Sequence, residues 1–216
     1  MSEVKTFDIL VAGGGMIGSA LALGLSRQGW QVALVEGSDH ETLVRAPEPA
    51  ATVADFEPRV SAVSVASQRL LEQLGVWSEV TAGRHCPYQT MTVWDGDGTG
   101  RIQFEAAELQ ARALGTIVEN RSIVRALFGA LEQSPVELIE GARITGCRRS
   151  SGSYALELED GQSLSAGLVV GCDGANSRLR QWVGLPTREW DYDQQAIVCT
   201  VQTSQSHRFT AWQRFQ

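Results

Sequence analysis

Apolar runs of strand length alternate with amphipathic segments of helix length at the start of the chain. The apolar run 7–12 is closed by three glycines, and residues 16–28 then place apolar side chains at helical spacing. Gly29 follows as a helix stop, and residues 31–36 form a second apolar run that ends in an acid. The first 36 residues therefore predict a strand–helix–strand unit.

The same patterns predict the remaining elements. Further helices are expected over 65–74, 122–133 and 177–183. Strands are expected over 91–94, 101–104, 136–140, 154–159, 168–172 and 195–202, with a strand-like run at 208–216. The strand at 136–140 is expected to return to the first sheet, and Asp160-Gly161 to turn a hairpin toward Leu164. Residues 37–58 carry three prolines and few periodic apolar positions, so a long loop is expected there.

Composition is that of an ordinary globular chain of 216 residues, with 43% hydrophobic and 20% charged residues. The net charge of -7 and the single lysine, Lys5, argue against nucleic acid as a partner, because phosphate binding needs clustered basic side chains. The apolar stretch 16–25 is interrupted by glycine and too short to span a bilayer, and no signal peptide is recognisable. We expect a cytoplasmic protein.

The residue types typical of metal or nucleophilic sites are scattered. Cys86, Cys147, Cys172 and Cys199 have no metal-ligand spacing, so reduced and mostly buried thiols are expected. The three histidines, His40, His85 and His207, lie in unrelated contexts. The sequence therefore assigns no metal site, and its catalytic residues stay unknown.

A dinucleotide fingerprint follows the first strand. Gly13 permits a tight turn, Gly15 lets the backbone approach a pyrophosphate, and Gly18 lets the helix lie close to the sheet. The helix that begins at Met16 and Ile17 would direct its N–H groups at the phosphates, and Glu36 would accept the ribose hydroxyls. The alternative is a glycine-rich turn with a surface glutamate. Nicotinamide and flavin dinucleotides share this half-site, so the fingerprint alone leaves both open.

A second motif distinguishes the two. Residues 169–180, VVGCDGANSRLR, resemble the Asp-Gly motif of the aromatic-hydroxylase class of flavin monooxygenases. The resemblance implies that Asp173 and Gly174 lie beside the pyrophosphate and ribityl chain of FAD and that the motif also serves NAD(P)H. The alternative for Asp173 is a helix cap or a turn aspartate.

Two further residues are candidates for the flavin side. Arg59 lies in the segment 58–64, PRVSAVS, and the resemblance implies that this arginine contacts the flavin part of FAD. The alternative is an ordinary surface arginine. Asn120 precedes the helix expected over 122–133, where its amide would hydrogen-bond ribityl oxygens or simply cap the helix.

Several short segments narrow the resemblance to the ubiquinone-biosynthesis hydroxylases: 75–77, 86–88, 93–94, 104–109, 118–120 and 190–192. The stretch 86–109 is most similar to the 2-polyprenyl-3-methyl-6-methoxy-1,4-benzoquinol hydroxylase branch. The resemblance implies an α/β fold in which a Rossmann-like FAD-binding domain of the aromatic-hydroxylase type carries an inserted, incomplete β-rich substrate domain. The FAD-binding domain would comprise 1–75 and 105–185, and the substrate domain 76–104 and 186–216.

Members of that family continue beyond the equivalent of residue 216, through a second Gly-Asp motif that binds the flavin. We therefore expect a C-terminally truncated chain that is inactive alone and holds FAD and NAD(P)H weakly or not at all. Trp212 and Phe215 would be exposed on an unpaired strand edge, which favours self-association, including a homodimer.

The resemblance implies a flavin monooxygenase. NAD(P)H or a partner reductase would reduce FAD, and a flavin C4a-hydroperoxide formed with O2 would hydroxylate the ring of a polyprenyl quinol or phenol in ubiquinone biosynthesis. Expected partners are that substrate, other enzymes of quinone biosynthesis, and the surface of the inner membrane. The ring position stays open. The alternatives are an NAD(P)-dependent oxidoreductase and a non-catalytic assembly member of a quinone-biosynthesis complex.

Overall fold

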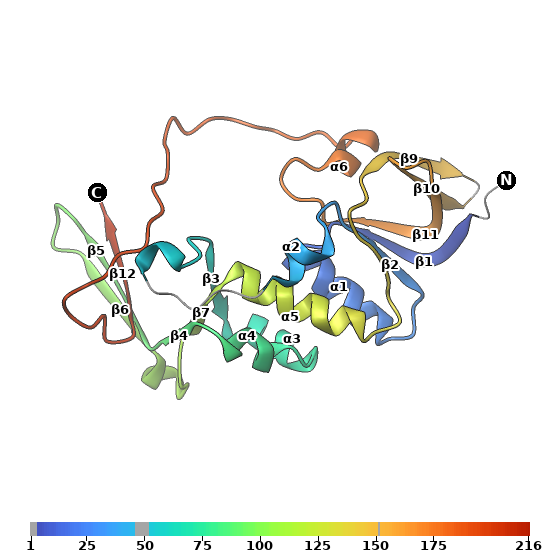
Figure 1. Cartoon of the computed structure of the whole chain (residues 1–216). Helices are drawn as coiled ribbons and strands as arrows, with labels where there is room; N and C mark the ends of the chain where they lie inside the picture. The colour runs from blue at the N-terminus through green and yellow to red at the C-terminus, as the bar shows by residue number, and fades with distance from the viewer. Residues whose placement is uncertain (1–3, 46–51, 151) are drawn as a thin grey trace. The chain divides into compact units, whose positions relative to one another are not determined.

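The structure is a computed structural model that describes residues 4–45, 52–150 and 152–216 (Figure 1). The chain forms two compact units. The first unit comprises residues 1–46 and 124–196, and the second comprises 47–123 and 197–216. The domains expected by function, 1–75 with 105–185 and 76–104 with 186–216, divide the chain at other points and stay a prediction.

A six-stranded sheet is the centre of the first unit, in the order β8-β2-β1-β11-β10-β9. Strand β1 (Lys5–Ala12) pairs in parallel with β2 (Val32–Val35) and β11 (Ser163–Gly171), and β2 pairs in parallel with β8 (Glu137–Ile139). The antiparallel strands β10 (Ser153–Leu158) and β9 (Ile144–Ser150) complete the sheet. Helix α1 (Met16–Ser26) connects β1 to β2, which confirms the predicted strand–helix–strand unit.

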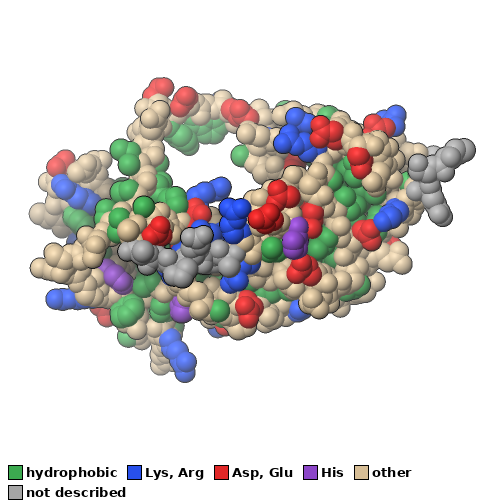
Figure 2. Space-filling view, viewed as in Figure 1, with side chains coloured by type: hydrophobic (Ala, Val, Ile, Leu, Met, Phe, Trp, Pro, Cys, Tyr) green, Lys and Arg blue, Asp and Glu red, His purple; other side chains and the backbone are tan. Residues whose placement is uncertain are grey.

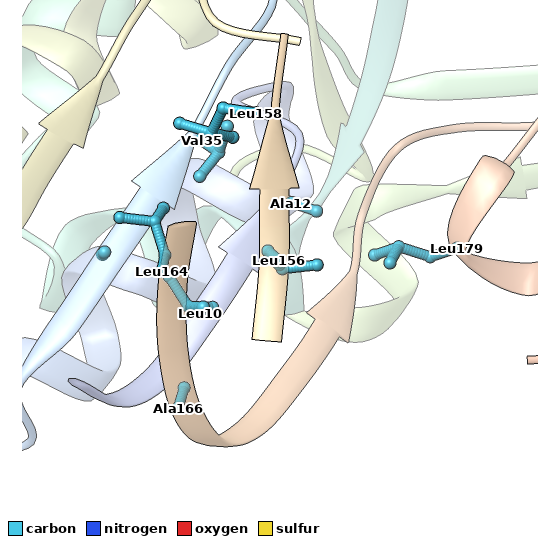
Figure 3. Close-up of a cluster of buried hydrophobic side chains, with 9 residues drawn as sticks. Leu10, Ala12, Val35, Leu156, Leu158, Leu164, Ala166 and Leu179 are labelled. Atoms are coloured by element: carbon cyan, nitrogen blue, oxygen red, sulfur yellow. The ribbon is translucent and has the colours of Figure 1, made fainter. Parts of the chain in front are cut away.

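The core of this unit forms because alternate strand residues point to the same face of the sheet. Leu10, Ala12 and Val35 from the parallel strands pack with side chains of the β10–β11 hairpin and of helix α6 (Arg178–Trp182) (Figure 3). The hairpin and helix side chains of this cluster are Leu156, Leu158, Leu164, Ala166 and Leu179. Helix α5 (Asn120–Glu132) buries a second apolar set, Leu127, Phe128 and Leu131. Ile9 to Ala12 of β1 are all buried, so both faces of this strand are covered, as is typical of a central parallel strand.

The second unit contains two three-stranded sheets. In one, β7 (Gly115–Glu119) lies between the antiparallel strands β3 (Val60–Ser64) and β4 (His85–Tyr88). In the other, β5 (Thr90–Asp95) pairs antiparallel with β6 (Arg101–Glu105) and in parallel with β12 (Thr210–Phe215). The unit also holds α3 (Val65–Gln73), α4 (Trp77–Ala82) and the 3-10 turns η1 (Val53–Asp55) and η2 (Ala106–Leu109).

Three element predictions were wrong. The expected loop 37–58 contains α2 (His40–Val44) and η1, and residues 46–51 of it lie outside the described residues. The expected strand 195–202 has no strand assignment, and Ile197 is 93% exposed. The expected separate strand 168–172 is the end of the longer β11, where Leu168 is 51% exposed rather than buried. Strands β3, β4, β7 and β9 were not predicted.

Two surface properties bear on the classes of partner. On the face shown in Figure 2, acidic and basic side chains are interspersed, which differs from the clustered Lys and Arg typical of nucleic-acid surfaces. Within residues 4–45, 52–150 and 152–216, no helix has the length and apolar character needed to cross a membrane.

Candidate cofactor site

Glycines shape the turn between β1 and α1. Gly13 has a φ of 101°, which side chains rarely adopt, and a Cβ on it would overlap the carbonyl oxygen of Cys172 at the end of β11. A Cβ on Gly18 would overlap the carbonyl oxygen of Gly13. Helix α1 therefore lies directly against the turn, as the fingerprint predicts for these two positions.

Gly15 differs from the other two glycines. Its φ is -64°, and a Cβ built on it has no atom of the described residues within 4 Å. The residue stands at the N-cap of α1, where no side chain of the described residues caps the helix, so the first N–H groups of α1 lack a side-chain acceptor there. Met16 and Ile17 are the first residues of that helix, and Ile17 is exposed. This arrangement fits a phosphate group, because helix N-termini bind anions through free N–H groups and the helix dipole.

A fourth glycine, Gly14, is constrained by residues far away in sequence. A Cβ on Gly14 would lie 2.8 Å from Cζ of Phe128 and 3.0 Å from Cβ of Glu36. The fingerprint leaves this position open to any residue, so the sequence did not single it out.

Glu36 is fixed beside this turn at the end of β2. Its Oε2 accepts a hydrogen bond from the Gly14 N–H at 2.5 Å, and its Oε1 accepts one from the Ser38 N–H at 2.8 Å. The side chain is half-buried and bonded within the turn itself, and its contact with a ribose stays a prediction. Each carboxylate oxygen keeps a further lone pair, so Glu36 can also accept ribose hydroxyls.

Asp173 lies between β11 and α6. Its Oδ1 accepts from Ser177 Oγ at 2.6 Å, and its Oδ2 accepts from the Leu179 N–H at 3.2 Å. Ser177 in turn accepts from the Arg180 N–H at 3.0 Å, and Gly174 has a φ of 84°. Asp173 therefore does cap the start of α6, which was the alternative interpretation. The same hydrogen bonds hold its carboxylate at the carboxyl end of the sheet.

One cavity of about 340 Å³ brings Gly13, Glu36 and Asp173 together within the first unit. Its apolar walls include Ala12, Val35 and Leu179, and its polar walls include Arg143, Asn176 and Arg178. Sequence reasoning missed those three polar residues and Trp182, which also lines the cavity. Their place along the chain could have identified them as candidates. Arg143, for example, follows the end of parallel strand β8, and ligands bind at the carboxyl ends of parallel strands. Carboxylates and guanidinium groups around apolar walls fit a ribose and a heterocyclic base, whereas Gly15 and the start of α1 are not among the residues that line this cavity.

The candidates Arg59 and Asn120 lie in the second unit. The Asn120 N–H donates to the Arg59 carbonyl oxygen at 3.0 Å, and Ser61 Oγ donates to Asn120 Oδ1 at 2.6 Å. The structure therefore brings Arg59 and Asn120 together. Their contacts with a flavin stay a prediction.

A buried acid next to Asn120 was missed by sequence reasoning. The Glu119 side chain is 5% exposed and accepts from Arg84 Nε at 2.8 Å and from Arg121 Nε at 3.0 Å. Burial acts to raise the pKa of Glu119, but hydrogen bonds from Arg84, Arg121 and the Glu57 N–H outweigh it, so this pKa lies below its ordinary value. We call Arg84, Glu119 and Arg121 the Glu119 cluster.

The cysteines correct two expectations. All four are free thiols, but Cys199 is exposed and the other three are half-buried rather than buried. Cys86 Sγ lies 4.0 Å from His207 Nε2, so this histidine is not isolated. Burial raises the pKa of Cys147 and, together with the charge of Asp173, that of Cys172. Among the residues that the structure describes, His, Cys, Asp and Glu form no group of three suited to a metal ion.

Comparison with known proteins places the chain in a family. The family model of the FAD binding domain matches residues 6–212. The 3-demethoxyubiquinol 3-hydroxylase of Escherichia coli (strain K12) is 40% identical over 211 residues, which is 96% of this chain and 51% of that protein. Ubiquinone hydroxylase UbiL of Rhodospirillum rubrum is 36% identical over 215 residues, which is 99% of this chain and 48% of that protein. The chain thus spans about half the length of the curated relatives it matches.

Solved structures share the fold. A probable FAD-dependent monooxygenase of Pseudomonas aeruginosa, PqsL, is similar with a TM-score of 0.68 and 25% identity, covering 87% of this chain and 48% of that one. The flavin-dependent monooxygenase PieE, solved with FAD and substrate, has a TM-score of 0.62 at 18% identity, covering 83% of this chain and 32% of that one. The PieE match shows the fold alone.

These matches confirm the predicted α/β fold class and the resemblance to ubiquinone-biosynthesis hydroxylases. They also decide between the two dinucleotides that the glycine fingerprint left open, in favour of FAD. Because the family model matches residues 6–212, and Gly13, Glu36 and Asp173 lie around one cavity, this chain belongs to the FAD binding domain family.

Proposed function

We propose that the complete protein is an FAD-dependent monooxygenase that hydroxylates the aromatic ring of a polyprenyl quinol or phenol in ubiquinone biosynthesis. The observation that carries the proposal is the shared cavity of Gly13, Glu36 and Asp173, in a chain whose relatives at 40% and 36% identity are named as hydroxylases of ubiquinone or its precursor. A cofactor that performs the redox chemistry also accounts for a sequence without a recognisable catalytic triad.

The residues of the first unit hold the cofactor in this proposal. The N–H groups at the start of α1 bind the pyrophosphate, Glu36 accepts the adenosine ribose hydroxyls, and Asp173 and Gly174 bind near the ribityl chain. Bound FAD supplies the electrons for O2 activation, with NAD(P)H or a reductase as the donor. The protein orients the substrate ring beside the flavin and excludes water.

The class of substrate determines where in the cell the protein is proposed to act. A polyprenyl quinol partitions into the bilayer, so we propose that the protein works at the surface of the inner membrane from the cytoplasmic side. Other enzymes of quinone biosynthesis and a second copy of the chain are proposed as partners.

Quinone analysis of a strain that lacks the gene tests the function. We expect a demethoxy or deoxy quinone intermediate to accumulate and the full-length gene to restore ubiquinone. A normal quinone profile in the deletion strain, with no second hydroxylase present, contradicts the proposal.

A Gly15→Val gene in the same strain tests the non-catalytic alternative. The Cβ of a valine there has no described atom within 4 Å, so the substitution is expected to fill the space in front of α1. We expect this variant, expressed at the normal level, to leave the intermediate in place. Restored ubiquinone would instead support a role in assembly that needs no cofactor.

A further inference from the structure

The second unit contains a separate cavity, with a volume of about 680 Å³. Strands β4 and β7, helices α3 and α4 and the segment 109–113 line it. None of its lining residues belongs to the cavity of Gly13, Glu36 and Asp173. Small-molecule sites usually measure about 300–1,000 Å³, so this cavity has room for a ligand of its own.

The regular elements around this cavity each contribute one face. On α3, Val65 and Arg69 stand four positions apart, which puts both residues on the same side of the helix. On the sheet, His85 and Pro87 alternate along β4, and Thr116 of β7 lies opposite Pro87. The lining side chains are therefore held by helix and strand backbones as well as by the segment 109–113.

The charged side chains that line this cavity are all basic. They are Arg69, His85 and Arg112, in a chain of net charge -7. Glu72 on α3 accepts from Gln68 Nε2 at 2.8 Å but is not a lining residue. Among the residues that the structure describes, neither Arg69 nor Arg112 has an ion-pair or hydrogen-bond partner. Arginines without an acid of the protein beside them favour an anionic ligand, because guanidinium groups bind phosphate through paired N–H donors.

A buried hydroxyl also lines the cavity. Thr116 is 5% exposed, and its Oγ1 has no hydrogen-bond partner among residues 4–45, 52–150 and 152–216. Buried polar groups are nearly always hydrogen-bonded, so this hydroxyl calls for a partner from outside the chain. A phosphate oxygen can accept a hydrogen bond from it.

The rest of the wall includes apolar side chains. Val65, Trp77 and Pro87 are half-buried, and Leu109, which also lines the cavity, is 71% exposed. A bound apolar group would cover these side chains from water, which is favourable in proportion to the area buried. A ligand that fits the whole cavity therefore combines an anionic group with an apolar part.

We propose that this cavity binds an organic phosphate, with the phosphate group on Arg69, Arg112 and the Thr116 hydroxyl and the apolar part against Trp77 and Leu109. The inference goes beyond the proposed function and does not depend on it. A free organic phosphate and the head group of a phospholipid have the same chemistry, so the test has an arm for each source.

Octyl phosphate, below its micelle concentration, is the probe for the full-length protein loaded with FAD. Saturation with FAD fills the dinucleotide site before the titration begins. We expect calorimetry to give a Kd about tenfold or more below that of inorganic phosphate, since the octyl chain adds apolar contact, and octanol alone to bind no better than inorganic phosphate. Tryptophan fluorescence should change during the titration in the wild type and not in Trp77→Phe.

Variants of the basic side chains test the phosphate contact. Arg69→Gln and Arg112→Gln should each raise the Kd for octyl phosphate about tenfold, and Arg112→Lys, which keeps the charge, should raise it less. Thr116→Val removes the hydroxyl at nearly constant shape and should raise the Kd about threefold or more. Arg149→Gln, at an exposed arginine of β9, is the matched control with an unchanged Kd. Both cavity arginines are exposed, so their variants should keep the wild-type melting temperature.

Sedimentation with lipid vesicles distinguishes the two sources of the phosphate. Binding to phosphatidylglycerol vesicles that is lost in Arg112→Gln would identify a phospholipid head group as the ligand. Octyl phosphate binding without vesicle binding would identify a free organic phosphate.

Equal Kd values for the wild type, Arg69→Gln and Arg112→Gln would overturn the inference. So would equal affinities for octyl phosphate and octanol, or release of FAD by the probe, which would place the probe in the dinucleotide site. Each of these results concerns the second unit of a protein that keeps its FAD, so the quinone profile that tests the hydroxylase function is judged independently.

Discussion

The Glu36 carboxylate accepts a hydrogen bond from the Gly14 N–H, with 2.5 Å between Oε2 and the nitrogen. Its other oxygen accepts from the Ser38 N–H at 2.8 Å. The acid that the fingerprint assigns to a ribose therefore also joins the end of β2 to the β1–α1 turn within the protein itself. Substitutions of Glu36 are thus expected to affect both cofactor binding and the turn.

Glu36→Gln tests this double role. An amide keeps one acceptor oxygen but turns an NH2 group toward a backbone N–H, so one of the two hydrogen bonds is lost. We expect a lower melting temperature of the apoprotein and weaker FAD binding, each by about 1–3 kcal/mol. Glu41→Gln in the neighbouring helix α2, where the acid is exposed and pairs with Arg45, is the matched control. A variant that loses FAD but keeps its full apoprotein stability would show that the Gly14 bond contributes nothing to the turn.

Gly15→Val is expected to leave the protein folded and to abolish FAD retention. The position has an ordinary φ of -64°, and a Cβ there has no described atom within 4 Å, so we expect the side chain to be accepted and to occupy the space proposed for the phosphate. Flavin absorbance per mole of purified full-length protein measures the effect, with circular dichroism as the check of folding. Gly129→Val, also at a glycine with open space, should keep its flavin. Normal flavin content in folded Gly15→Val would refute the pyrophosphate assignment.

Gly18→Ala is expected to destabilise the fold. The added methyl group would overlap the carbonyl oxygen of Gly13, and backbone atoms cannot move away as a flexible side chain could. Overpacking of this kind costs about 1–3 kcal/mol or more, measured as the free energy of unfolding in urea. Gly129→Ala in helix α5 should instead stabilise the protein by about 1 kcal/mol. Equal stabilities of the two variants would mean that α1 can move away from the turn.

The Glu119 cluster predicts a specific response to acid. The pKa of Glu119 lies below its ordinary value of 4.5, so the folded state binds the proton less readily than the unfolded state. The stabilising contribution is fully present above the ordinary value and is lost as the pH falls through the lower folded pKa. Urea unfolding from neutral pH downward should show Glu119→Gln less stable than the wild type at neutral pH, with the gap closing in acid. Glu79→Gln, at an exposed acid of α4, should keep the wild-type profile.

Alkylation should distinguish the cysteines. The pKa values of Cys147 and Cys172 lie above their ordinary value of 9.0, because burial disfavours the thiolate, and at Cys172 the Asp173 charge adds to the effect. The thiolate is the reactive form, so iodoacetamide in mild excess should modify exposed Cys199 well before these two. Peptide mass spectrometry measures the order, and all four thiols should react alike in denaturant. Equal rates at Cys172 and Cys199 in the folded protein would contradict the partial burial of Cys172.

The sequence alone was sufficient to predict an element where the residues that determine this element lie close together along the chain. Residues 5–36 contain both the strand and helix periodicities and the glycines that join them, and the structure has those elements at those places. The constraint on Gly14 could not be predicted, because it comes from Phe128 on a helix more than a hundred positions later. The Glu119 cluster likewise depends on the pairing of β4 with β7, two short strands with no distinct pattern of their own. Residues 195–202 have apolar positions typical of a strand, but a pattern alone does not provide a partner strand to pair with.

Parallel pairing of β1 with β11 places Lys5 opposite Leu164 and Ala12 opposite Gly171. During synthesis, the glycine turn after β1 therefore leaves the ribosome long before β11, the strand whose end packs against Gly13. Until then β1 has β2 as its neighbour on one side and an open edge on the other, and such non-local pairing is slow to form. We expect nascent chains that end before residue 163 to depend on chaperones, and the first unit to become protease-resistant only after β11 has emerged.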